Sequence, residues 1–217
     1  MKLYIASISP DEVRQASELG ISHLITNPTV IAQSGTNWRS DLLRSLELLD
    51  GDVHLQTTPD EPDSILEQVA DFSSLCAGRL VVKLPFTRLA MRAFPELRKA
   101  QFPVNLTGIV NLAQGAAAVS AGADFISVYV GRATANGNNG VDLIRSLSDI
   151  VFRAGLPTRI IAASIHTPAE FAAVSVAGAH ATACPYDLLC EIVDDKVTDH
   201  SMRAFQEDWR RTTDNGA

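Results

Sequence analysis

The sequence predicts an α/β fold: a closed barrel of eight parallel strands, each followed by a helix, in a single domain of residues 1–217. Three observations predict it. Short apolar runs recur along the whole chain and alternate with stretches of helical spacing. The runs are continuous, as is typical of parallel strands that are covered on both faces. A chain of 217 residues holds eight strand–helix units, near the lower end of the range for this fold.

Eight apolar runs are expected to form the strands. They span residues 3–6, 23–26, 53–57, 80–84, 104–107, 124–129, 159–163 and 179–184. The helices expected between them span residues 10–20, 40–49, 64–76, 89–100, 112–121, 141–154 and 168–177. The alternative is an open sheet with a nucleotide-binding turn. The glycines form neither GxGxxG after the first strand nor GxxxxGKS/T, so we rank nucleotide-binding folds below the barrel.

Several helix boundaries are marked by their residues. Ser9 before Pro10 is typical of an N-cap that is followed by a first-turn proline. Thr167 and Glu170 have the spacing of a capping box, in which each side chain bonds the backbone of the other residue. Glycines stand where helices are expected to end, at Gly20, Gly122, Gly155 and Gly178.

An additional amphipathic helix is expected after the eighth unit, over residues 200–212. No linker or low-complexity segment separates this helix from the barrel. We expect it to pack on the barrel or on a neighbouring subunit.

The composition excludes several classes of protein. Hydrophobic residues make up 46% of the chain and charged residues 20%, which is typical of a globular protein rather than a disordered one. The 18 basic and 25 acidic residues give a net charge of −7, so nucleic acid is not an expected partner. No apolar run reaches the roughly 18–20 residues of a membrane span, and no signal peptide is recognisable. With three cysteines and no metal-ligand spacing, we expect a cytoplasmic protein without a disulfide framework or a metal site.

Lys83 is the leading candidate for chemistry, because the active sites of such barrels lie at the carboxyl ends of the strands. Of the four lysines, Lys83 alone lies inside an apolar strand. Burial disfavours its charged form, and a desolvated amine forms Schiff bases with ketones and aldehydes. The alternative is a structural lysine that extends to the rim and pairs with an acidic residue.

Other polar residues follow the strands and form a second group of candidates. A tyrosine hydroxyl can act as an acid or base, and glutamine or threonine can hold a water. Late barrel loops often bind phosphate, for which arginine and serine are suitable donors. Each of these side chains could instead satisfy nearby backbone groups or remain in solvent. The candidates are Thr26, Asn27, Gln56, Asn105, Thr107, Ser127, Tyr129, Arg132, Ser164 and His166.

Several motifs resemble those of a known family. They include Thr26-Asn27-Pro28 and Val81-Val82-Lys83-Leu84-Pro85, followed by Tyr129-Val130-Gly131-Arg132 and Ala162-Ala163-Ser164. With them, the chain resembles the small transaldolase-like class I aldolases nearly from end to end, and most of all the bacterial fructose-6-phosphate aldolases. The resemblance implies a (β/α)₈ barrel with Lys83 as the Schiff-base lysine.

The resemblance also implies roles for the other candidates. Tyr129 would be the acid/base, acting through a water held by Gln56 and Thr107. Arg132 and Ser164 would bind the substrate phosphate, with His166 beside them. Four further residues would contact the substrate or line its pocket: Thr26, Asn27, Asn105 and Ser127. The family uses a sugar or sugar-phosphate substrate without metal or cofactor, and it assembles as homo-oligomers, pentamers or decamers.

Three departures from the family pattern keep alternatives open. Ala6 stands where the family has an aspartate, and His166 stands where many relatives have a lysine or arginine. The pair Asn105-Leu106 replaces a more usual Leu-Gly pair. Gln56 with Tyr129 favours direct aldol cleavage and addition, because true transaldolases carry glutamate and usually phenylalanine there. Transaldolase activity is the first alternative. A degenerate sugar-phosphate-binding barrel, suggested by Ala6, is the second.

Overall fold

The strands form a closed parallel barrel, as predicted. The structure is a computed structural model in which residues 1–58 and 61–214 are described. Each strand pairs with the next in chain order, and the last pairs with the first. The strands are β1 (Lys2–Ile5), β2 (His23–Ile25), β3 (Val53–Gln56), β4 (Leu80–Pro85), β5 (Val104–Ile109), β6 (Phe125–Tyr129), β7 (Arg159–Ala163) and β8 (Ala181–Cys184).

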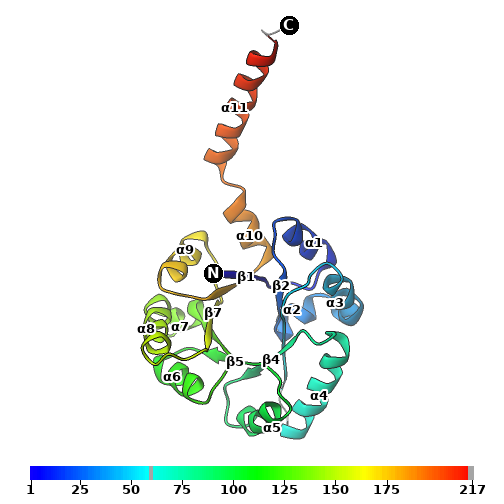
Figure 1. The fold of residues 1–217 in the computed structure, drawn as a ribbon, viewed down its shortest axis with the longest axis vertical. Coiled ribbons are helices and arrows are strands. Elements are labelled where there is room, and N and C mark those ends of the chain that lie inside the picture. The colour runs from blue at the N-terminus through cyan, green and yellow to red at the C-terminus, as the bar shows by residue number, and fades with distance from the viewer. Residues whose placement is uncertain (59–60, 215–217) are drawn as a thin grey trace.

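The helices surround this barrel as a ring (Figure 1). The predicted ones, except α5, lie within a few residues of their expected bounds. They are α1 (Pro10–Glu18), α3 (Trp38–Leu46), α4 (Pro62–Leu75), α5 (Phe94–Lys99), α6 (Leu112–Ser120), α8 (Gly140–Arg153) and α9 (Pro168–Val176). Four further elements were not predicted: α2 (Pro28–Gln33), α7 (Val130–Ala135), α10 (Tyr186–Val193) and the 3₁₀ turn Gly35–Asn37. Two of these helices have six residues, too few to show helical periodicity.

The helix predicted over residues 89–100 is wrong as a continuous element. It consists of the 3₁₀ turn Ala90–Arg92 and the short helix α5. Pro95 explains the break, because proline has no backbone N–H and its ring clashes with the preceding helical turn. Proline is tolerated in the first turn of a helix, and α5 accordingly begins at Phe94.

The predicted helix boundaries are confirmed in part. The four glycines follow their helices with φ angles between 60° and 97°, a region that favours glycine. The Thr167 hydroxyl accepts from the Glu170 N–H at 3.1 Å, but the Glu170 carboxylate reaches past the cap to the N–H of His166. Ser9 stands at the start of α1 without a side-chain cap. Ser7 holds that turn instead, because its Oγ accepts from the Ser9 N–H at 3.0 Å.

Two apolar layers result from the alternation of side chains along the strands. Outward residues pack against the helices in one large buried cluster. Inward residues fill the barrel with a smaller cluster from β1, β2, β7 and β8. The inward His54 packs between aromatic rings, 4.8 Å from Tyr4 and 4.9 Å from Phe125 between ring centroids. The barrel is therefore a packed support and not an open channel.

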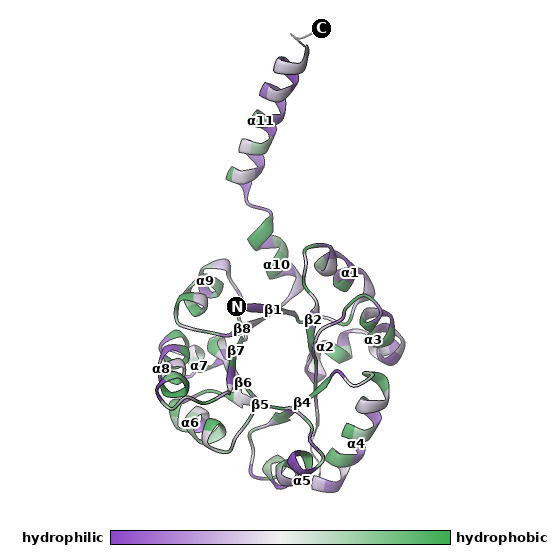
Figure 2. Ribbon diagram, in the orientation of Figure 1, coloured by the Kyte–Doolittle hydropathy of each residue, from purple (hydrophilic) through white to green (hydrophobic). Residues whose placement is uncertain are grey.

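The C-terminal helix α11 (Lys196–Asp214) extends beyond both ends of the predicted range, residues 200–212. It extends away from the barrel beyond α10 (Figure 1), so it does not pack on the barrel. Most of its residues are hydrophilic, whereas the helices around the barrel carry broad hydrophobic segments (Figure 2). Large apolar residues on it are nevertheless exposed: Val197, Met202, Phe205 and Trp209. Over the described residues, no helix combines the length and apolar character of a membrane span.

Candidate functional site

A cavity of about 570 Å³ opens at the carboxyl ends of the strands. Seven of the eleven residues singled out from the sequence line it: Thr26, Asn27, Lys83, Tyr129, Arg132, Ser164 and His166. They come from four different strands or the segments that follow them, and only the closed barrel brings them together. The other four do not line the cavity. These are Gln56, Asn105, Thr107 and Ser127, whose positions lie on β3, β5 and β6.

Lys83 lies on the cavity wall with only 3% of its surface exposed. Its Nζ donates to the Thr26 carbonyl oxygen at 2.9 Å. Among the described residues no carboxylate pairs with it, so the alternative of an ion pair at the rim is wrong. Burial, and next the charge of Arg132, lower the pKa of Lys83 to about 7. A buried amine that is partly neutral at neutral pH can act as a nucleophile.

Tyr129 lies near both Lys83 and Arg132 in the cavity. The Lys83 Nζ is 6.0 Å from the centroid of the tyrosine ring, and the Arg132 Cζ is 4.8 Å from it. The short helix α7 starts directly after Tyr129, which carries Arg132 back over the ring. At this distance the guanidinium makes a cation–π interaction with the ring. The arginine therefore presents its charge to the cavity in a defined position.

The segment after β7 lines the cavity next to Arg132. Ser164 has a φ of 58°, which is rare for a residue other than glycine. Its Oγ lies 3.2 Å from Nε2 of His166, and its carbonyl oxygen accepts from the Gly131 N–H at 3.0 Å. A Cβ on Gly131 would lie 2.6 Å from that carbonyl oxygen. Glycine at this position thus allows Arg132 and Ser164 to converge.

Asn105 and Ser127 form an internal network in place of lining the cavity. The Ser127 Oγ donates to the Asn105 Oδ1 at 3.0 Å, and the Asn105 Nδ2 lies 3.0 Å from Nδ1 of His54. Nδ1 of His54 therefore accepts, and the proton is on Nε2. Burial, with a smaller effect of Lys83, lowers the pKa of His54 well below its usual value, so its ring is neutral. A substrate contact by Asn105 or Ser127 stays a prediction.

Gln56 and Thr107 flank Lys83 inside the barrel. Gln56 pairs in register with Lys83 on one side, and Thr107 pairs with Pro85 two residues further along β4. The Gln56 Oε1 and the Thr107 Oγ1 are buried, and the described residues offer them no hydrogen-bond partner. Buried polar atoms are almost always satisfied by protein or by ordered water, so both oxygens are suited to hold a water.

Asn27 and Thr26 close the β2 side of the cavity. The Asn27 Oδ1 caps α2 by accepting from the Val30 N–H at 3.0 Å, which leaves its Nδ2 as the free donor. The Thr26 hydroxyl is buried and lies 3.4 Å from the carbonyl oxygen of His54. Thr26 therefore contacts Lys83 through its backbone.

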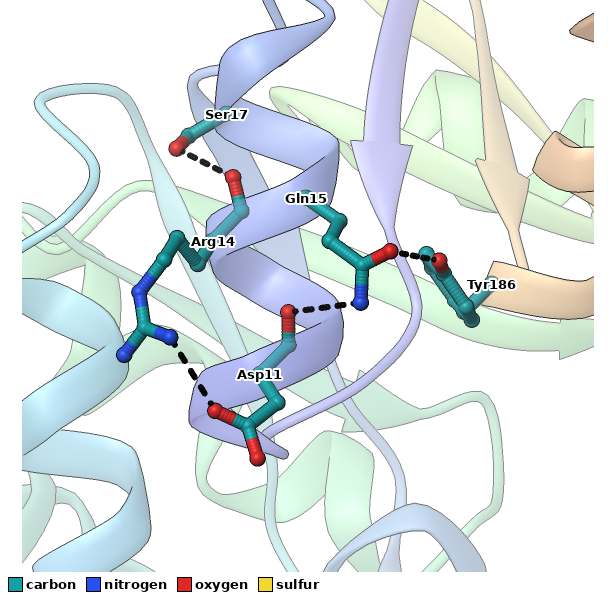
Figure 3. Close-up of polar contacts among 5 residues, drawn as sticks. All are labelled: Asp11, Arg14, Gln15, Ser17 and Tyr186. Atoms are coloured by element: carbon teal, nitrogen blue, oxygen red, sulfur yellow. Dashed lines mark hydrogen bonds and ion pairs between the residues drawn. The ribbon is translucent and has the colours of Figure 1, made fainter.

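Sequence reasoning missed the residues that close the cavity between β8 and β1. Tyr186 and Asp187 follow β8, and Glu12 lies in the first half of α1. The Tyr186 hydroxyl donates to the Gln15 Oε1 at 2.6 Å and so connects α10 to α1 (Figure 3). Extending the search past the end of the eighth strand would have found Tyr186. No local pattern marks Glu12, which the sequence shows only as an acid near a helix start.

A comparison with family models decides the family. The model described as Transaldolase/Fructose-6-phosphate aldolase matches residues 3–216, nearly the whole chain. The chain belongs to this family. It is similar to a probable transaldolase of Desulforudis audaxviator, with 32% identity over 212 residues, 97% of this chain and 98% of that one. A probable transaldolase of Heliobacterium modesticaldum is 31% identical over 215 residues, 99% of this chain and 100% of the other.

Solved structures of other enzymes share the fold. A flavocytochrome b2 variant with bound sulfite has a TM-score of 0.63 and 10% identity over 86% of this chain and 57% of its own. A mandelate oxidase variant has a TM-score of 0.59 and 17% identity over 85% of this chain. This transaldolase-family chain spans about 64% of the length of that oxidase. At such low identity the likeness shows the barrel alone.

Proposed function

We propose that this protein is a Schiff-base (class I) transaldolase, which moves a dihydroxyacetone unit between sugar phosphates with Lys83 as the nucleophile. One observation carries the proposal: an amine with a pKa of about 7 lies buried on the wall of a cavity and has no paired carboxylate among the described residues. A large share of that amine is neutral at neutral pH, and the neutral amine attacks carbonyl carbon. The relatives named probable transaldolases support the transfer reaction.

The reaction follows from the chemistry of an iminium ion. The Lys83 Nζ attacks the ketone carbon of the donor, and loss of water from the carbinolamine forms the iminium. The bond between C3 and C4 then breaks, its electron pair moves into the iminium to form an enamine, and the proton of the C4 hydroxyl leaves to a base. The aldehyde departs. The enamine adds to the acceptor aldehyde, which takes up a proton, and water releases the new ketose.

Tyr129 is proposed to move these protons through a water. The Lys83 Nζ lies 6.0 Å from the centroid of its ring, and both side chains line the same cavity, so a water between them could carry the proton. The unpartnered oxygen atoms of Gln56 and Thr107 support a water at this place. Gln56 and Thr107 do not ionise at neutral pH, so they position the water and the tyrosine hydroxyl exchanges the proton.

Arg132 is proposed to bind the substrate phosphate together with Ser164 and His166. Arginine binds phosphate with two parallel hydrogen bonds, and the neighbouring hydroxyl adds a donor. Ser164 and His166 lie within hydrogen-bond distance of each other on the same wall. This arrangement supports a phosphate end of the substrate near β6 and β7, with the reacting carbonyl at Lys83.

Direct aldol cleavage is the second candidate function, and Gln56 and Tyr129 favour it. In the resemblance described above, transaldolases carry glutamate and usually phenylalanine at these positions. A tyrosine that protonates the enamine would release dihydroxyacetone without an acceptor. The two reactions share every step up to the enamine, so the fate of the enamine distinguishes them.

The deciding experiment measures product from fructose 6-phosphate with and without an acceptor. Without an acceptor, a transaldolase releases at most one glyceraldehyde 3-phosphate per active site and turns over only when a four-carbon aldose phosphate is present, whereas an aldolase turns over with the donor alone. Borohydride reduction with dihydroxyacetone, followed by peptide mapping, identifies the modified lysine. Folded protein without an adduct at Lys83 would overturn the Schiff-base proposal and favour a binding barrel.

We also propose that the chain forms a homo-oligomer through α11. The helix extends from the barrel and carries exposed apolar side chains, among them Phe205 and Trp209. Burial of such residues against a second copy would remove apolar surface from water. Light scattering after size-exclusion chromatography tests this, with Trp209→Asp expected to reduce the mass of the particle. A monomeric wild-type protein at micromolar concentration would contradict it.

A further inference from the structure

Glu12 lines the same cavity as Lys83, yet the mechanism above gives it no part. The residue lies in the first half of α1 and is half-buried. Its Oε2 accepts from the Ser7 hydroxyl at 2.5 Å. Ser7 is itself fixed, because its Oγ accepts from the Ser9 N–H at 3.0 Å and its proton is thereby directed at the carboxylate. The glutamate is thus held in place on the wall.

The second carboxylate oxygen of Glu12 is free. Among residues 1–58 and 61–214, neither a backbone group nor a side chain donates to Oε1, and no basic residue pairs with Glu12. An ionised carboxylate can only accept hydrogen bonds, so its natural ligand at this oxygen is a hydroxyl or an amine. Next to Ser7, Ala6 adds only a methyl group to this wall, which leaves room for such a ligand.

The charges on the cavity wall determine which end of a substrate lies near Glu12. Arg132 stands on the side of β6 and β7, whereas Glu12 and Asp187 stand on the side of β8 and β1. A phosphate is attracted to the first side and repelled from the second. A sugar phosphate bound through Lys83 therefore directs its uncharged hydroxyl-bearing end toward Glu12.

We propose that Glu12 is a specificity-determining residue, whose Oε1 accepts a hydrogen bond from a hydroxyl of the ketone donor bound at Lys83. It would select dihydroxyacetone-type donors over ketones without hydroxyl groups. Ser7 is the positioning residue that orients the carboxylate. The inference rests on the proposed function, because it needs a ketone bound at Lys83.

The test compares two ketones that differ in their hydroxyl groups. The protein is incubated with cyanoborohydride at increasing concentrations of dihydroxyacetone or acetone, and the trapped adduct is measured by intact mass. The concentration dependence gives an apparent dissociation constant for each ketone. We expect Glu12→Gln to weaken the dihydroxyacetone adduct by about tenfold or more, as for loss of a hydrogen bond to a charged group, and to change the acetone value less than about twofold. Ser7→Ala should weaken dihydroxyacetone trapping by a smaller factor and likewise leave acetone unchanged.

Asp11→Asn is the matched control, because Asp11 is the neighbouring acid on α1, does not line the cavity and faces Arg14 (Figure 3). It should leave both ketones unchanged. Equal loss for dihydroxyacetone and acetone in Glu12→Gln, or no loss for either, would overturn the role of Glu12. If Glu12→Gln does not fold, the Ser7→Ala variant decides by the same comparison. A wild-type protein that traps neither ketone at Lys83 would instead refute the proposed function itself.

Discussion

Lys83→Met should stabilise the folded protein, and by an amount that depends on pH. Burial and Arg132 lower the pKa of Lys83 from 10.5 to about 7, which corresponds to about 5 kcal/mol between its two protonation states. The variant also loses the bond from Nζ to the Thr26 carbonyl, worth about 1 kcal/mol. We therefore expect Lys83→Met to be more stable than the wild type by about 4 kcal/mol at pH 6, from the shift in pKa less the lost bond.

The direction in which stability changes with pH follows from which state, folded or unfolded, binds the lysine proton. Between pH 7 and 10.5 the unfolded lysine holds a proton that the folded lysine has lost, so wild-type stability rises with pH across this window. Below pH 7 both states are protonated and the full penalty remains. The advantage of the methionine variant should accordingly shrink from pH 7 upward and be gone by about pH 10.

Urea unfolding at fixed protein concentration, from pH 6 to 10, measures this difference. The half-buried ring of Trp38 packs edge-on against the buried Phe72, 6.4 Å between centroids, so its fluorescence reports on the packing of the helices around the barrel. Lys2→Met is the matched control, because Lys2 is partly exposed and pairs with Asp52 at 3.7 Å. It should show no gain in stability. A stability difference for Lys83→Met that is constant from pH 6 to 10, or a variant less stable than wild type at pH 6, would refute the reasoning.

Three further outcomes are expected. The rate of borohydride-trapped adduct formation at Lys83 should rise with pH through about 7 and then level off, because the neutral amine attacks; a flat profile from pH 5 to 9 contradicts this. Arg132→Met should raise the midpoint of that profile, since the arginine charge lowers the pKa of Lys83. The same variant should raise KM for fructose 6-phosphate by at least about tenfold, as expected for lost charge-assisted hydrogen bonds. An unchanged KM would show that Arg132 does not bind the phosphate. Asn105→Ala should lower the free energy of unfolding by about 2–4 kcal/mol, because His54 and Ser127 each lose a buried partner, and urea unfolding without such a loss would show that the network is not stabilising.

The candidate site illustrates which inferences local sequence supports. Lys83 stood out because a lone lysine in an apolar strand is unusual whatever the tertiary context. Tyr129 and Arg132 were found because they follow a strand end, although the short helix α7 that carries Arg132 over the ring was not foreseen. The hydrogen bonds of Asn105 and Ser127 inside the barrel were not predicted. Their partner His54 lies on another strand, 51 residues away from Asn105, and only barrel closure pairs them.

The sequence by itself determined the strand–helix alternation, because burial on both faces requires continuous apolar strands, and glycine is favoured where helices end with positive φ. It also singled out Lys83, because burial disfavours the charged form of a lysine inside an apolar strand. The tertiary structure alone decided which polar side chains face the cavity and which bond each other beneath it. Glu12 shows why: it shares the cavity with Tyr186 and Asp187, more than 170 residues further along the chain, and the convergence of such distant segments leaves no local pattern in the sequence.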